Sequence, residues 1–108
     1  MGTSEQSVLS KRDRHIKAKH ADSFVLVVSG DSLKDDGIQD GDMLVIDPHS
    51  DLQIGKLYVV RIGPEFFARH IYIEGDIVRL KAANSHYEDI KVTACNIVGR
   101  VIWKMGKM

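Results

Sequence analysis

A serine in a sharp acidic turn is the residue of this chain whose surroundings best suggest chemistry. Ser32 follows Gly30 and Asp31, just after an apolar run that ends at Val28. Glycine relieves backbone strain in such a turn, and an aspartate side chain can hydrogen-bond to nearby backbone amides. A serine hydroxyl becomes a nucleophile only when a neighbouring base takes its proton. A Gly-Asp-Ser turn by itself is therefore more often structural than catalytic. Whether Ser32 has a catalytic role must be judged from the residues around it.

Those surroundings resemble a known family. Residues 24–103 are similar to the C-terminal domain of LexA-type repressors, UmuD-type proteins and temperate-phage repressors, the peptidase S24 family. The likeness rests on the Gly-Asp-Ser turn, the Gly-Ile-Gln-Asp-Gly-Asp run at 37–42 and the apolar strand that ends at Asp47. The turn motif comprises Gly30, Asp31, Gly37, Gly41 and Asp42. The resemblance implies that Ser32 occupies the position of the nucleophile with which family members cleave their own chain.

The position where the family carries its catalytic lysine is occupied by Arg69. A buried lysine can lose its proton and act as a base, because desolvation lowers its pKa. Arginine keeps its proton in proteins, since its pKa stays above about 12. The next residue, His70, would point to the opposite face of the strand. No Ala-Gly or Cys-Gly bond, the kind that the family cleaves, occurs in the first 30 residues. We therefore expect Ser32 and Arg69 to be a vestigial dyad without peptidase activity.

The elements that must position these residues read as strands. Short β-rich apolar runs are separated by glycine, proline and aspartate, and Gly75-Asp76 has the form of a tight hairpin turn. The expected strands cover 24–28, 43–46, 57–62, 66–73, 77–80, 90–94 and 97–105. The first two are continuous enough to suggest burial on both sides. The fold class is therefore all-β, and the resemblance implies a LexA/signal-peptidase-like fold of short, strongly twisted, mostly antiparallel strands.

Length, charge and cysteine content limit the classes of protein to which this chain can belong. The chain has 108 residues and 15 basic against 15 acidic side chains, which suits one domain and gives no global attraction to nucleic acid. Its single cysteine, Cys95, suits a reducing cytoplasm, and no apolar run is long enough to span a bilayer. We interpret residues 1–20 as an expression-tag remnant followed by a basic linker, and residues 21–108 as the domain. The histidines have no metal-ligand spacing, so neither a metal nor another cofactor is expected.

Without catalysis, the family resemblance implies a role in self-association. Such a domain would hold two helix-turn-helix DNA-binding domains, which are absent from this chain, on the half-sites of operator DNA. The closing segment is the expected contact between copies, through Val98, Arg100, Ile102 and Trp103, although core packing of Trp103 is an equal alternative. The expected partners are further copies of the chain, operator DNA through the missing domain, and an antirepressor protein, with no membrane and no small-molecule substrate. An active self-cleaving peptidase and a UmuD-like polymerase accessory subunit remain alternatives.

Overall fold

The structure is a computed structural model that describes residues 22–106, and the expected linker at 1–20 lies outside them. Seven strands form one antiparallel sheet in the order β1-β2-β7-β3-β4-β5-β6. The strands are β1 (Phe24–Val27), β2 (Met43–Asp47), β3 (Leu57–Ile62), β4 (Glu65–Glu74), β5 (Ile77–Lys81), β6 (Ile90–Val92) and β7 (Asn96–Met105). A single 3-10 turn, Lys34–Asp36, is the one helical element of the described residues. The prediction of an all-β fold of short antiparallel strands is confirmed.

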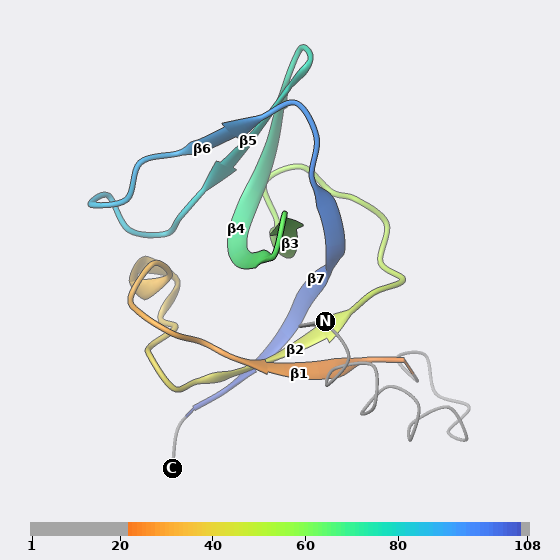
Figure 1. Ribbon diagram of the computed structural model, residues 1–108. Coiled ribbons are helices and arrows are strands. Elements are labelled where there is room, and N and C mark those ends of the chain that lie inside the picture. Colours follow the sequence, from red (N-terminus) through yellow and green to blue (C-terminus); the bar gives the residue numbers. More distant parts are fainter. Residues whose placement is uncertain (1–21, 107–108) are drawn as a thin grey trace.

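Strand β7 joins the two parts of the sheet. It pairs with β2 along one edge and with β3 along the other, so it connects β1 and β2 to the meander of β3 to β6. Its register shifts twice, opposite Val45/Ile46 and opposite Val59/Val60. Such bulges bend a strand and increase its twist. Figure 1 shows the result, a sheet so curled that β1 and β2 lie well away from β5 and β6.

Curling produces two clusters of core side chains. The first cluster lies under β1, β2 and the acidic turn, and its buried members are Phe24, Leu33, Ile38, Leu44, Ile46 and Val59. The second lies between β3, β4 and β5, and its buried members are Tyr58, Val60, Ile71 and Leu80. Half-buried Cys95 packs against this second cluster, and burial raises the pKa of its thiol. None of the helices in residues 22–106 has the length and apolarity that a membrane crossing requires.

The expectation that residues 24–28 are buried on both sides is wrong. Strand β1 lies at an edge of the sheet, and its alternate side chains face outward, with Val27 66% exposed. In β2, likewise, Leu44 and Ile46 are buried while Met43 and Val45 are only half-buried. A continuous apolar run is typical of a strand covered on both faces, but it cannot show whether another layer covers the second face. No described element covers it here.

The alternation expected in the closing strand is also broken. Simple alternation along the strand would place Ile97, Val101, Trp103 and Met105 on one face, but Val101 packs against the first core cluster while Trp103 is 65% exposed. The register shift between Val45 and Ile46 is the cause, because an extra residue in one strand changes which face its neighbours occupy. Trp103 is therefore a surface residue, and core packing, one of the two alternatives for it, is wrong.

The buried hydroxyl of Tyr58 forms two hydrogen bonds to the 51–53 loop, and their contribution to stability can be measured. Tyr58 is fully buried, and its hydroxyl donates to the Asp51 carbonyl at 2.9 Å and accepts from the Gln53 amide at 2.7 Å. Tyr58→Phe should lower the free energy of unfolding by about 1 kcal/mol, because both loop groups lose their partner. Urea denaturation measures this loss. Tyr72→Phe is the control, since the Tyr72 hydroxyl forms no hydrogen bond with another described residue, and an equal loss in both variants would contradict the explanation.

Candidate active site

The acidic turn is built by residues from both ends of its loop. Gly30 and Gly37 have φ angles of 90° and 76°, in the left-handed region where glycine is favoured. The Val28 amide donates to the Asp42 carbonyl at 2.8 Å, and the Gly41 amide donates to the Val28 carbonyl at 2.9 Å. The loop is therefore closed where β1 ends and β2 begins, which explains the glycines and acids of the 37–42 run. This closure leaves Ser32 facing β4.

A second loop holds the turn from the other side. The side-chain amide of Asn84 donates to the Asp31 carbonyl at 2.8 Å, and the Tyr87 hydroxyl donates to an Asp31 carboxylate oxygen at 2.9 Å. The hydrogen bond to Asp31 is the largest of the causes that raise the pKa of Tyr87. Asn84 is buried and also accepts from the His86 amide. The position of Ser32 thus depends on a segment more than fifty residues away in the sequence.

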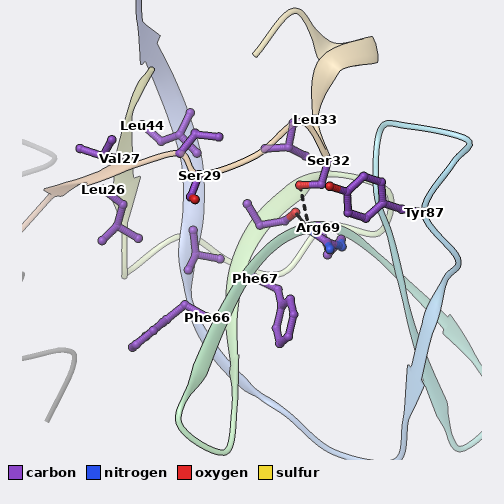
Figure 2. Close-up of a pocket in the computed structure, with 13 residues that line it drawn as sticks. Leu26, Val27, Ser29, Ser32, Leu33, Leu44, Phe66, Phe67, Arg69 and Tyr87 are labelled. Atoms are coloured by element: carbon purple, nitrogen blue, oxygen red, sulfur yellow. Dashed lines mark hydrogen bonds between the residues drawn. The ribbon is translucent and has the colours of Figure 1, made fainter. Parts of the chain in front are cut away.

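The structure brings Ser32 and Arg69 together. Arg69 lies in β4, and its Nη1 donates to the Ser32 hydroxyl oxygen at 3.2 Å and to the Ala68 carbonyl at 2.9 Å. Figure 2 shows the two side chains meeting beside Tyr87. The direction of this hydrogen bond matters for the chemistry. A general base must accept the serine proton, whereas the guanidinium can only donate.

The surroundings of Arg69 are unusual for a cation. Its side chain is 7% exposed, and no carboxylate of the described residues forms an ion pair with it. Its charge instead lies over two rings, 5.4 Å from the centre of Phe67 and 5.6 Å from that of Tyr87. Burial lowers the pKa of the Arg69 guanidinium below its ordinary value, and Tyr87 partly opposes this shift. A guanidinium keeps its charge at neutral pH, so Arg69 cannot accept a proton from Ser32.

His70 does not supply the missing base. Its Nε2 lies 2.7 Å from an Asp36 carboxylate oxygen, and its Nδ1 lies 2.8 Å from the Gly55 carbonyl. Both ring nitrogens are therefore occupied away from Ser32. The histidine ties the 3-10 turn to the loop before β3. Among residues 22–106, no group of three histidine, cysteine or acidic side chains lies close enough together to hold a metal ion.

A cavity of about 340 Å³ opens beside this pair. Ser32 and Arg69 line one end and the edge of β1 lines another side, while Phe66 and Phe67 of β4 also line the cavity, with their rings pointing in different directions. Its lining residues are Leu26, Val27, Val28, Ser29, Ser32, Leu33, Leu44, Val59, Phe66, Phe67, Ala68, Arg69 and Tyr87. The volume falls in the range of ligand-binding cavities. The site thus combines a mostly apolar groove with one buried cation.

Some residues of the site escaped the sequence analysis. Asn84 and Tyr87 belong to a stretch that contributes to the family resemblance, but nothing in the sequence placed them beside Ser32, and the two phenylalanines were expected only as part of a strand. Their proximity to Ser32 arises from the curl of the sheet, which has no local sequence signal. The expected contact residues of β7 lie elsewhere: Arg100 and Ile102 line a shallow depression with Asp47, and Val98 packs against the first core cluster.

Comparison with known proteins identifies the class. The peptidase S24-like family matches residues 4–102, so the chain belongs to this family, whose members are related to self-cleaving serine peptidases. It is 33% identical over 79 residues to the LexA repressor of Clostridium tetani, 35% over 81 residues to that of Clostridium perfringens, and 38% over 87 residues to that of Geotalea uraniireducens. These matches cover 73%, 75% and 77% of this chain.

The matched region is only part of each relative. It covers 40% of the Clostridium tetani and Clostridium perfringens proteins and 43% of the Geotalea uraniireducens protein. The chain therefore spans less than half the length of these relatives.

Proposed function

We propose that this chain is the C-terminal oligomerisation domain of a phage-type transcriptional repressor that does not cleave itself. In this proposal two or more copies associate in the bacterial cytoplasm and hold upstream helix-turn-helix domains on the half-sites of operator DNA. Tethering makes the second DNA contact intramolecular, which can raise avidity by about 10²- to 10⁴-fold. The relatives' name, LexA repressor, supports the regulatory part. Repression would be relieved either by an antirepressor protein or by the SOS signal.

The observation that carries the proposal is an apolar face on the outside of β1, β2 and β7. Residues that lie opposite one another in an antiparallel pair share a face. The register places Val27 beside Met43 and Met105, and it places Val25 and Trp103 beside Val45. We call this set the outer apolar face: Val25, Val27, Met43, Val45, Trp103 and Met105.

Exposure of this face favours self-association. Val27 and Trp103 are 66% and 65% exposed, and Met105 is also exposed. Apolar patches of this kind mark contact surfaces in proteins, and tryptophan is enriched among the residues that dominate binding energy. A flat face on one subunit can pack against the same face of a second subunit around a twofold axis, the commonest symmetry of protein dimers. The occupant that we propose is therefore a second copy of this chain.

Sedimentation velocity tests the proposal. The domain should be a dimer or larger at micromolar concentration, and Trp103→Lys should weaken association about 30-fold or more, because a charge would replace a buried aromatic contact. Ile73→Lys is the matched control, since Ile73 is 48% exposed but lies near the β4–β5 hairpin, outside the outer apolar face. A wild-type domain that remains monomeric up to about 100 μM would refute self-association. Equal weakening by both variants would place the contact elsewhere.

A further inference from the structure

The Arg69 guanidinium has hydrogen-bond donors that the described residues leave unused. Among those residues only its Nη1 finds acceptors, the Ser32 hydroxyl oxygen and the Ala68 carbonyl, and the buried Nε finds none. A buried charge is costly unless it is paired and hydrogen-bonded. The cation–π contacts with Phe67 and Tyr87 offset only part of that cost. An anion bound beside Arg69 would therefore meet a cation that no described carboxylate neutralises.

The Ser32 hydroxyl supplies a further donor at the same end of the cavity. Its oxygen accepts from Arg69, while its own proton has no acceptor among the described residues. A hydroxyl carries one donor besides its lone pairs, so this proton is free to turn toward a ligand. Figure 2 shows Ser32 and Arg69 side by side next to Tyr87. A pair of neighbouring donors suits a carboxylate, because each carboxylate oxygen can accept from one of them.

The rest of the cavity determines what the carboxylate must be attached to. Of the described residues that line the cavity, Arg69 is the one with a charge, and most of the others are aliphatic or aromatic, including Leu26, Leu44, Val59 and Phe66. An inorganic anion would gain nothing from those walls, and a neutral hydrocarbon would leave the donors unused. A carboxylate with an apolar tail satisfies both. The volume of about 340 Å³ lies near the small end of ligand cavities, so the tail must be short.

We propose that this cavity binds a free, small monocarboxylate with a short apolar tail. The carboxylate accepts hydrogen bonds from Arg69 and Ser32, and the tail lies against Leu44 and Phe66. Arg69, which cannot accept the Ser32 proton, then acts together with Ser32 as a pair of donors in a ligand site. This inference goes beyond the proposed function. Val27 lines the cavity and also belongs to the outer apolar face, so ligand binding must be measured at residues that the two surfaces do not share.

Titration of the unmodified protein with octanoate, followed by proton–nitrogen NMR, tests the proposal. The amide signals of Ser32, Phe67 and Ala68 should shift. Octanoate should bind about 10-fold or more tightly than octanamide, which has the same tail without the charge, because hydrogen bonds to charged groups are the stronger ones. In the series butanoate, hexanoate, octanoate, each added methylene should tighten binding by up to about 4-fold, the effect of removing it from water.

Protein variants test the two donors separately. Arg69→Gln should abolish the preference for octanoate over octanamide. Ser32→Ala should weaken octanoate binding about 10-fold, the loss expected for one hydrogen bond to a charged group. Arg79→Gln is the matched control and should bind as wild type does, since its guanidinium is paired with Glu74 and Asp89 away from the cavity. If Arg69→Gln does not fold, the ligand comparisons on the unmodified protein still decide.

Several results would overturn the proposal. Equal affinity of octanoate and octanamide would mean that Arg69 does not bind the carboxylate, and acetate that binds as tightly as octanoate would mean that the apolar walls contribute nothing. Absence of binding at about 10 mM octanoate would remove the site altogether. Shifts confined to Trp103 and Met43 would show that octanoate only covers the outer apolar face. Sedimentation velocity without ligand measures self-association separately, so failure here is distinguishable from failure of the proposed function.

Discussion

A longer form of this protein that includes its natural upstream segment should remain intact at pH ~10. Self-cleavage by the family requires a base that accepts the serine proton, and general-base catalysis contributes about 10²- to 10⁴-fold to a rate. A lysine becomes a better base as the pH rises because it loses its own proton, whereas the Arg69 guanidinium keeps its proton and donates to Ser32. Incubation at pH ~7 and pH ~10 followed by gel electrophoresis measures the outcome.

Two variants make this experiment decisive. Ser32→Ala is the control for background proteolysis, and a discrete fragment that this variant abolishes would refute the inactive assignment. Arg69→Lys restores the residue type on which the family depends. If Arg69→Lys cleaves itself and does so faster at higher pH, the base alone is missing from the wild-type protein. If Arg69→Lys remains uncleaved, a cleavable bond is missing as well. Whatever the result for Arg69→Lys, the wild-type protein should yield no fragment whose amount depends on pH.

Gly99→Ala should strongly destabilise the fold. A Cβ at Gly99 would lie 2.7 Å from the Asp47 carbonyl oxygen and 2.7 Å from Cγ2 of Ile46, and both residues are buried. Gly99 lies in β7, which is paired on both sides, so the strand cannot move away from one neighbour without disturbing the other. Overpacking of this kind costs about 1–3 kcal/mol. For a domain of this size, the melting temperature should fall by roughly 4–8 °C for each kcal/mol.

Gly106→Ala is the matched control, because nothing lies within 4 Å of a Cβ at that position. Thermal denaturation followed by circular dichroism compares the two variants with wild type. If both variants have the melting temperature of the wild-type protein, β7 has room for a Cβ beside Asp47 and the close approach does not constrain the residue at position 99. If only Gly99→Ala unfolds at a lower temperature, the close approach of β7 to Asp47 requires a glycine at this position.

Several features followed from the sequence because their causes are local. Short apolar runs interrupted by glycine and proline predicted the strands, and Gly75-Asp76 predicted the β4–β5 hairpin, which pairs Glu74 with Ile77. The Gly-Asp-Ser turn and the 37–42 run carried the family resemblance, and the family was confirmed. The inability of arginine to serve as a base is a property of the side chain itself. None of these conclusions needs knowledge of what lies nearby in space.

The remaining features depended on contacts between distant segments. Tyr87 and Asn84 reach the Asp31 turn only because the sheet curls, and the bulges that curl it have no local sequence signal. The same bulges set Trp103 outward and Val101 inward, although simple alternation places them on one face. Side-chain direction in a strand depends on register, and register is decided by pairing across the sheet. The sequence alone therefore determined which residue types could accept or donate a proton, while tertiary packing decided that Arg69 would be buried beside Ser32 without an ion pair to any carboxylate of residues 22–106.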